Sequence, residues 1–452
     1  MRIIPKLPIT LKEIADATNT NITSNESIVA ITTSSKEVCP GDLFVAIKGE
    51  TANGEDFTEE AKNKGAYILS SKDDCSDFKV NDTLVALLEI ASHYKTKLKH
   101  LKSTVAITGS VGKTTSKNIL SKMLSHQKRV HYTEGNYNNF LGLSHTILNA
   151  PIDTEVLVAE IGMNHLGEID ILSKALKPDI SVITNIGTSH VGNLGSREII
   201  AKAKLEILNG MKSPKVIVPY EEELLKNVSG KYTYSTEFND ANCFIHPKNL
   251  TAFGSVFDIH TQKYDIYNQR ITLPGRHILK SVAISISVME LLNLNNEEIS
   301  ASLPSLDSTC TRAKLAKIGA ITVYDDTYSS SPEAVIAVFN LLSLDKNTEK
   351  SCMLGDMLEL GSDAEKLHKM IGTAVVEYKF EKLFAFGIYA PFIAEGAKSA
   401  GMKDENIFIN TDINAPQITA KQILENSKSG EIILFKASHA VHAERIYDFL
   451  DN

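Results

Sequence analysis

A glycine-rich turn before Lys113 and Thr114 is the strongest chemical signal in the sequence. Residues 107–115 read ITGSVGKTT, with a β-branched apolar run before the turn and a helical pattern after it. Strand, glycine turn, Gly-Lys-Thr and helix form the P-loop pattern, in which backbone N–H groups and a helix N-terminus bind phosphate. We expect Lys113 to contact the β- and γ-phosphates and Thr114 to ligate Mg²⁺. The predicted triphosphate site comprises Thr108, Gly109, Ser110, Val111, Gly112, Lys113, Thr114 and Thr115.

The turn departs from the common P-loop pattern at one position. The residue five before Gly112 is Ile107 rather than glycine, so the loop has the shorter Thr-Gly-x-x-Gly-Lys-Thr form. The alternative interpretation is an ordinary glycine turn that happens to precede a helix. The strand pattern before the turn and the helical pattern after it favour nucleotide binding.

Two further residues offer metal ligands beside a triphosphate. Glu160 ends the apolar run VLVAE, and His190 lies six residues past the run SVIT. Functional groups gather at the carboxyl ends of parallel strands, so both residues are expected to face the P-loop. A carboxylate and an imidazole suit Mg²⁺ that is also held by phosphate oxygens. Taken alone, each has a structural alternative, a strand-end surface acid for Glu160 and a loop residue for His190; His165 is assigned a structural role.

Lys204 has two competing interpretations. It falls on a predicted helix within AKAKLEIL, and periodicity alone favours a solvent-facing lysine. A desolvated lysine with a lowered pKa can instead take up CO₂ as a carbamate and become an anionic ligand for a second Mg²⁺. Nothing in the spacing of the sequence demands the second interpretation.

Length and composition indicate a soluble protein of about three domains. The chain has 452 residues, of which 43% are hydrophobic and 23% charged, and its net charge is −8. This balance gives no global attraction for nucleic acid. We find no apolar run of membrane-spanning length and no signal-peptide pattern, and the five cysteines lack metal-like spacing. We therefore expect a cytoplasmic enzyme with free thiols.

The order of apolar runs predicts an α/β fold. Thr10 and Glu13 form a capping-box pattern that opens a short helix. Strand patterns alternating with helices from residue 104 onward predict a parallel sheet, followed by an antiparallel excursion over residues 231–273. A polar, serine-rich stretch at 293–311 predicts a hinge before a second nucleotide-binding-like unit. The predicted domains are a small N-terminal α/β domain (1–98), a central P-loop ATPase domain (99–305) and a C-terminal Rossmann-like domain (306–452).

These motifs resemble the Mur ligase family over nearly the whole chain. GDLFVAIKGETANGEDFTEEAKNKGA (41–66) is similar to the family's N-terminal uridine-nucleotide domain. The P-loop, GNYNNFLGL (135–143), EIGMNHLGEI (160–169), TNIGTSHVGNLGS (184–196) and AKAKLEI (201–207) resemble its central domain. DDTYSSSPEAV (325–335) and LGDMLELGSDAEKLHKMIG (354–372) resemble its C-terminal domain. The segment LGDMLELG is typical of the branch of the family that adds D-alanyl-D-alanine.

The resemblance implies an ATP-dependent, acid–amino-acid ligase that works through an acyl phosphate. It implies that D-alanyl-D-alanine is joined to a UDP-N-acetylmuramoyl tripeptide during cytoplasmic peptidoglycan precursor synthesis. Two Mg²⁺ ions are implied, one on Thr114 and Glu160 and the other on His190 and carbamylated Lys204. Arg312 and Asp326 match residues that reach the nucleotide, and Asn138 and Asn139 match an asparagine-rich loop near the phosphates. The resemblance further implies a monomer.

Several substrate-reading positions depart from the family pattern. The usual Asp-Ser-Arg of the first domain is Ser34-Ser35-Lys36, and Ile278 and Ser281 replace asparagines near the adenine. Tyr-Asn-Ala-Asn-Pro is replaced by Tyr-Ser-Ser-Ser-Pro over 328–332, and the usual Lys-Gly-Ser by Lys-Ala-Ser over 436–438. A related ligase with a different amino acid or dipeptide acceptor is therefore the first alternative. A stand-alone P-loop ATPase and a nucleotide-sugar-binding protein without catalysis are alternatives of other classes.

Overall fold

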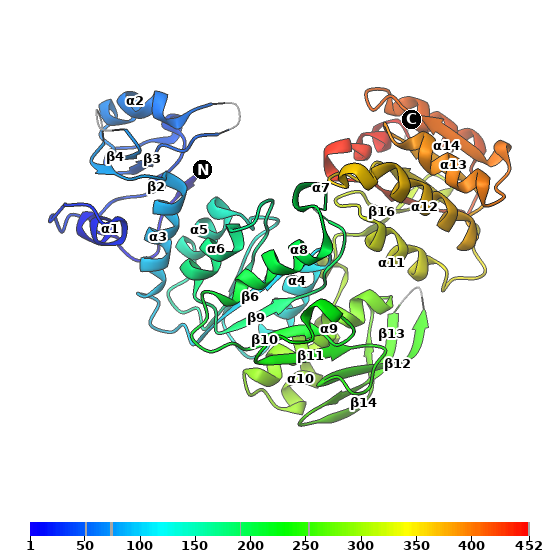
Figure 1. Cartoon of the computed structure of the whole chain (residues 1–452), viewed down its shortest axis with the longest axis horizontal. Coiled ribbons are helices and arrows are strands. Elements are labelled where there is room, and N and C mark those ends of the chain that lie inside the picture. Colours follow the sequence, from blue (N-terminus) through cyan, green and yellow to red (C-terminus); the bar gives the residue numbers. More distant parts are fainter. Residues whose placement is uncertain (50–51, 73–75, 190, 252–253, 451–452) are drawn as a thin grey trace. The chain divides into compact units, whose positions relative to one another are not determined.

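The computed structural model describes residues 1–49, 52–72, 76–189, 191–251 and 254–450. These residues form two compact units. The first comprises Met1–Thr108, Gln127–Val182 and Ala203–Val216, and the second comprises Gly109–His126, Ile183–Lys202 and Ile217–Asn452. Helices and strands are labelled in Figure 1.

The first unit begins with a small sheet of order β1-β2-β3-β4-β5, in which only β1 and β2 pair antiparallel. The predicted capping box is present, because Glu13 N–H donates to the Thr10 hydroxyl and Thr10 N–H donates to the Glu13 carboxylate. The elements are β1 (Arg2–Ile3), α1 (Leu11–Thr18), β2 (Ile31–Thr32), β3 (Leu43–Val45), α2 (Thr58–Asn63), β4 (Tyr67–Ser70), β5 (Phe78–Lys79) and α3 (Thr83–Lys95).

The same unit carries the strands that lead to the predicted site. They lie in the order β9-β6-β8-β7, and β8 pairs parallel with both β6 and β7. Every residue of β6, β8 and β9 is buried, as their continuous apolar runs predict. Helix α3 packs against α5 and α6. The elements are β6 (Ser103–Thr108), β7 (Val130–Tyr132), α5 (Phe140–Leu148), β8 (Val156–Glu160), α6 (Glu168–Leu176) and β9 (Ile180–Ile183).

The second unit contains the helix of the phosphate loop and the antiparallel excursion. Strands β12, β13 and β14 pair antiparallel, as predicted for the excursion, whereas β11 at its start pairs parallel with β12. Helix α4 packs against α9, where Ser116 Oγ donates to Ser281 Oγ over 3.0 Å. The elements are α4 (Lys113–Leu124), α7 (Val191–Leu194), α8 (Arg197–Leu205), β10 (Val216–Pro219), β11 (Lys231–Ser235), β12 (Cys243–Thr251), β13 (Gly254–Thr261), β14 (Asp265–Ile271) and α9 (Arg276–Leu291).

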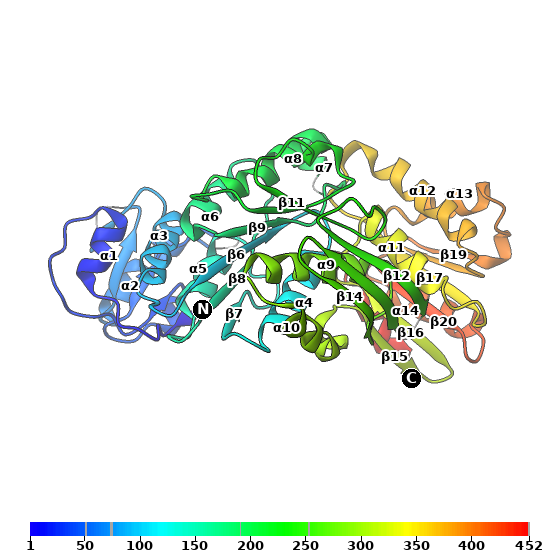
Figure 2. The ribbon, with the colours of Figure 1, turned by 90° about the horizontal axis from the view of Figure 1, so that it is seen from below.

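The last part of the second unit is a doubly covered sheet of order β15-β16-β20-β17-β18-β19, visible in Figure 2. Its strands pair parallel except at the β15 edge. Along β17, Cys352 and Leu354 pack with α11, α12 and α13, whereas Met353 packs with α14, as strand alternation requires. The elements are β15 (Lys314–Ile318), β16 (Ile321–Asp326), α11 (Pro332–Leu342), β17 (Lys350–Gly355), α12 (Ala364–Glu377), β18 (Leu383–Phe386), α13 (Ala390–Ser399), β19 (Ile407–Asn410), α14 (Pro416–Asn426) and β20 (Ile432–Lys436).

The predicted hinge at 293–311 is more ordered than its composition suggests. It contains α10 (Asn296–Ser302), which opens with a capping box between Asn295 and Glu298, and two short 3₁₀ turns. The strands β6 to β14 and β15 to β20 fall within the second and third predicted domains, whose boundaries stay predictions. No helix among the described residues is long and apolar enough to cross a bilayer.

Candidate active site

The phosphate loop has a backbone that only glycine adopts readily. Gly109 has a φ of 150° and Gly112 a φ of 82°. A Cβ on Gly109 would lie 1.8 Å from Thr184 Oγ1, so no side chain fits there. A Cβ on Gly112 would meet no atom of the described residues within 4 Å, so the space beside this residue is open. The turn that the sequence predicts is therefore present, with room on its outer side.

Helix α4 starts at the lysine of the predicted motif. Its first intrahelical hydrogen bond runs from Ser116 N–H to Gly112 O over 2.9 Å, and Gly112 offers no side-chain cap. The first backbone N–H groups of any α-helix are not used for hydrogen bonds within the helix, and the helix dipole adds positive potential at this end. Lys113 Nζ donates to Gly109 O over 2.8 Å, so its side chain folds back over the loop. These features suit an anionic ligand.

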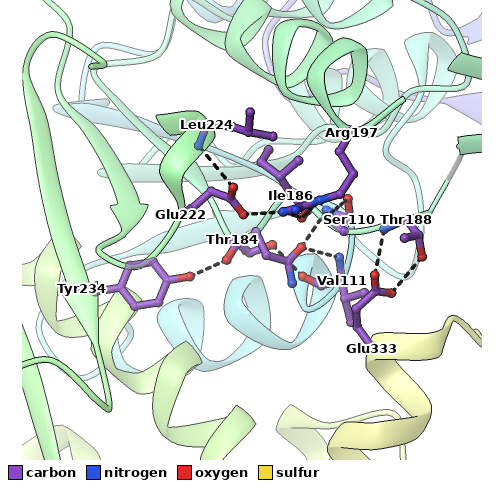
Figure 3. A network of polar contacts seen from close by, with 12 residues as sticks. Ser110, Val111, Thr184, Ile186, Thr188, Arg197, Glu222, Leu224, Tyr234 and Glu333 are labelled. Atoms are coloured by element: carbon purple, nitrogen blue, oxygen red, sulfur yellow. Dashed lines mark hydrogen bonds and ion pairs between the residues drawn. The ribbon is translucent and has the colours of Figure 1, made fainter. Parts of the chain in front are cut away.

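The segment after β9 supports the phosphate loop from beside it (Figure 3). The N–H groups of Ser110 and Val111 donate to Asn185 Oδ1 over 3.0 and 2.9 Å, and Thr184 Oγ1 donates to Val111 O over 2.6 Å. Gly187 N–H donates to Ser110 Oγ over 2.9 Å. Two of the amides predicted to bind phosphate thus have a protein acceptor. Sequence reasoning missed Asn185, although its place one residue past the run SVIT, ahead of His190, is a usable signal.

Arg312 reaches the phosphate loop. Its Nη2 donates to Thr114 Oγ1 over 2.6 Å, and its guanidinium lies 3.7 Å from the centre of the Tyr328 ring. Such stacking holds a guanidinium plane in place. Arg312, which is predicted to contact the nucleotide, is therefore hydrogen-bonded to Thr114, which is predicted to bind Mg²⁺.

Asp326, also predicted at the nucleotide, ends β16 beside a buried lysine. Lys436 Nζ lies 2.6 Å from Asp326 Oδ2 and donates to Ser329 O over 2.7 Å. Only 1% of the Lys436 side chain is exposed, so the ion pair compensates the cost of burying its charge. Nearby, burial lowers the pKa of His277 to about 4, and Asp326 opposes this shift only in part.

Glu160, in the first unit, is buried and hydrogen-bonded. Glu160 is 1% exposed, which excludes the surface-acid interpretation. Asn138 Nδ2 donates to Glu160 Oε1 over 2.9 Å, and a Cβ on Gly162 would lie 2.9 Å from the Asn138 amide. Asn138 therefore orients the carboxylate. The neighbouring Asn139 caps α5, since its Oδ1 accepts from Gly142 N–H over 2.9 Å.

Lys204 is buried, contrary to what periodicity favoured. It is 1% exposed, whereas Lys202 on the same helix is exposed. Ile200 and Ile207 are also buried, and they stand four residues before and three residues after Lys204. This i, i+4, i+7 spacing places the lysine on the apolar stripe of the helix. The solvent-facing interpretation is wrong, and the desolvation that a carbamate requires is present.

His190 lies outside the described residues, so its predicted role stays a prediction. His165 is exposed, and Gly167 rather than His165 caps α6. In the second unit, the open glycine loop and the Thr114 hydroxyl at a helix N-terminus suit a triphosphate with its Mg²⁺, and in the first unit the buried Glu160 carboxylate is itself a suitable Mg²⁺ ligand. Thr108 Oγ1, at the end of β6, is buried without a hydrogen-bond partner among the described residues, so it too is available to a ligand.

A second group of metal-capable side chains lies on β12 and β13. His246, Asp258 and His260 have ligand atoms within 4.8 Å of one another. Asp258 pairs with Lys248 over 2.7 Å, and His260 Nδ1 lies 2.8 Å from Asp265 Oδ1. Because Asp258 already pairs with Lys248 and His260 with Asp265, we assign the group a structural role.

Comparison with known proteins places the whole chain in one family. Residues 27–95 match the Mur ligase family catalytic domain, residues 107–289 the Mur ligase middle domain, and residues 312–439 the Mur ligase glutamate ligase domain. UDP-N-acetylmuramoyl-tripeptide–D-alanyl-D-alanine ligase of Bacillus subtilis is 34% identical, covering 97% of this chain and 97% of its own.

Two solved structures share the fold over nearly the full length. MurF from Acinetobacter baumannii superposes with a TM-score of 0.89 at 25% identity, covering 99% of this chain and 100% of its own. MurF ligase from Thermotoga maritima in complex with ADP superposes with a TM-score of 0.81 at 27% identity, covering 93% of this chain and 96% of its own. These matches confirm the predicted three-domain α/β fold, and the chain belongs to the Mur ligase family.

Proposed function

We propose that this protein is the ATP-dependent ligase that joins D-alanyl-D-alanine to the carboxylate of a UDP-N-acetylmuramoyl tripeptide. The single observation that carries the proposal is the contact of Arg312 Nη2 with Thr114 Oγ1, made on an open P-loop in a chain of this family. A ligase needs an arginine from its C-terminal part at the phosphates, whereas a nucleotide-sugar-binding protein without catalysis does not.

The reaction uses ATP because a carboxylate is a poor acylating agent. A carboxylate oxygen of the tripeptide attacks the γ-phosphorus, and ADP leaves with the electron pair of the broken P–O bond. The amine of the dipeptide then attacks the acyl carbonyl, phosphate leaves, and the amine loses a proton. Both steps crowd anionic oxygens together, so catalysis rests on positioning and on positive charge.

Each residue of the site has a proposed role. Lys113 and Arg312 neutralise the phosphate oxygens, and Asp326 and the asparagines at 138 and 139 lie at the nucleotide. Thr114 and Glu160 hold one Mg²⁺, and His190 with carbamylated Lys204 holds another. Mg²⁺, when bound, neutralises the crowded phosphate and carboxylate oxygens. The carbamate forms when neutral Lys204 Nζ adds to CO₂ and loses a proton.

The first domain is proposed to hold the uridine diphosphate. At the altered Ser34-Ser35-Lys36, Lys36 is exposed, which keeps a positive charge available where the family has arginine. We further propose a monomeric enzyme of cytoplasmic precursor synthesis. A ligase with another acceptor is the second candidate, because substrate-reading positions are altered in Tyr328–Pro332 and Lys436–Ser438.

Phosphate release tests the proposal. It should require ATP, Mg²⁺, the UDP-tripeptide and D-alanyl-D-alanine together, and omission of any one should reduce it to background. ATP hydrolysis indifferent to both peptides would contradict the proposal and favour a stand-alone P-loop ATPase. A parallel screen with lysine- and diaminopimelate-containing tripeptides against D-amino acids and dipeptides distinguishes the second candidate, which would show robust ligation with another acceptor only.

A further inference from the structure

Residues 184–189 and 191–192, here called the segment 184–192, are hydrogen-bonded to the phosphate loop. Asn185 Oδ1 accepts from the N–H groups of Ser110 and Val111, and Gly187 N–H donates to Ser110 Oγ. Arg197, the first residue of α8, adds a bond from its Nη2 to Ile186 O over 2.8 Å. Three hydrogen bonds therefore join the segment to the phosphate loop, and Arg197 supports the segment from α8.

The same segment is also held by residues of the C-terminal third of the chain. Glu333, in the first turn of α11, accepts from Thr188 N–H at Oε1 over 2.9 Å and from Thr188 Oγ1 at Oε2 over 3.2 Å. Figure 3 shows the Glu333 carboxylate directed at Thr188. A Cβ on Gly187 would lie 3.2 Å from the Glu333 carboxylate, so the backbone runs close beside it.

A second contact lies four residues further along. Gly192 N–H donates to Glu359 O over 3.0 Å, and a Cβ on Gly192 would lie 2.6 Å from Gly361 N. The two contacts thus hold the segment at Thr188 and at Gly192, on either side of position 190 in the sequence.

We propose that Glu333 is a positioning residue that clamps the segment 184–192 onto the phosphate loop. The inference rests on the proposed function, because the segment includes His190, the proposed ligand of a metal ion. Glu333 acts on the phosphate loop through Thr188, Gly187 and Ser110. By this means the C-terminal third of the chain orders the loop that serves catalysis.

The simpler alternative is that Glu333 only stabilises α11. An acidic residue in a first turn interacts favourably with the helix dipole wherever it stands. Glu365 is the matched control, because it is an exposed acid in the first turn of α12, within the same sheet domain. Loss of either acid should affect its helix alike, whereas only loss of Glu333 should release the segment.

Three variants of the full chain separate these explanations: Glu333→Ala, Glu333→Gln and Glu365→Ala. Glutamine offers an oxygen to Thr188 N–H and an amide donor to the Thr188 hydroxyl, so Glu333→Gln should restore both bonds. We expect Glu333→Ala to speed amide hydrogen exchange in peptides covering 184–192 and to lower kcat by about fivefold, as for loss of one or two hydrogen bonds. Its Mg²⁺ requirement should rise, while its KM for ATP changes little.

In Glu333→Gln and Glu365→Ala, amide hydrogen exchange in this segment should equal that of the wild type. Their kcat should stay within about twofold of wild type, a smaller change than the loss of one hydrogen bond would cause. If Glu333→Ala shows the same amide hydrogen exchange as the wild type over residues 184–192, the proposed clamp is wrong. It is also wrong if Glu365→Ala loses as much kcat as Glu333→Ala. The exchange measurement uses no substrate. It therefore decides the clamp even if the wild-type protein fails to ligate D-alanyl-D-alanine, a result that would instead contradict the proposed function.

Discussion

The phosphate loop and helix α8 each supply a lysine to the proposed reaction, and they are built differently. Lys113 follows two glycines with positive φ and opens a helix, with its Nζ folded back onto Gly109 O. Lys204 is the next-to-last residue of helix α8 and is 1% exposed. The first position is fixed by local backbone geometry, whereas the second is fixed by what packs against one helix face.

This difference explains why the sequence pattern predicted the turn before Lys113, whereas helical periodicity alone favoured an exposed Lys204, which is in fact buried. A glycine turn determines its own shape, so its pattern predicts the arrangement of its residues. A lysine on a helix is expected at the surface unless it stands on the apolar stripe, and only the spacing from Ile200 and to Ile207 reveals that it does.

Replacing Lys113 should have the largest effect. Lys113→Ala removes a charge that strengthens its contact with phosphate as negative charge develops, so kcat should fall by roughly 10²–10³-fold or more. Steady-state ADP release measures this. If Lys113→Ala keeps most of its kcat, the glycine-rich turn is not the ATP-binding loop and Lys113 does not contact the phosphates.

Lys204 and Lys202 provide a matched pair on one helix. Lys204→Ala should lower kcat by about a hundredfold because an anionic ligand is lost, and stripping bicarbonate from the wild type should lower its activity reversibly. A short carboxylic acid added in solution should partly rescue Lys204→Ala by occupying the vacated ligand site. Lys202→Ala should stay within about twofold, as expected of a surface substitution.

If Lys204→Ala and Lys202→Ala show equally small losses of kcat, Lys204 does not act as a metal ligand any more than the surface residue Lys202 does. Full activity in Lys204→Ala would end the carbamate proposal, while leaving the phosphate loop untouched.

Replacement of Asn138 or Asn139 should have the smallest effects. The two variants distinguish orientation of the Glu160 carboxylate by Asn138 from capping of helix α5 by Asn139. Asn138→Ala removes the donor to Glu160, and loss of such an outer partner should lower kcat by about tenfold and raise the Mg²⁺ concentration needed for activity. Asn139→Ala removes a helix cap and should lower the free energy of unfolding by about 1 kcal/mol. Kinetics and denaturant unfolding of both variants measure this. An unchanged kcat in Asn138→Ala would contradict its orienting role.

Much of the fold follows from the sequence because its signals are local. The capping box at Thr10 and the buried run of β8 form where they were predicted, and the antiparallel strands β13 and β14 lie within the predicted excursion. Strand β15 was missed because four of its five residues are exposed, and it is held only as an edge beside β16.

The parts of the site that sequence reasoning missed depend on distant partners. Asn185 is recognisable only once Ser110 and Val111 are known to lie beside it. Glu333 has the sequence signature of any first-turn acid, and its two bonds to a residue 145 positions away are visible only in the fold. The pairing of Lys436 with Asp326, which is 110 positions earlier, is likewise visible only in the fold.

The central claim is that ATP activates the tripeptide carboxylate as an acyl phosphate. A UDP-tripeptide labelled with oxygen-18 in its terminal carboxylate tests this directly in a single incubation with ATP, Mg²⁺ and D-alanyl-D-alanine. We predict ADP and phosphate as products, with one oxygen-18 atom carried from the carboxylate into phosphate for each amide formed. Unlabelled phosphate, or AMP and pyrophosphate in place of ADP and phosphate, would contradict the account.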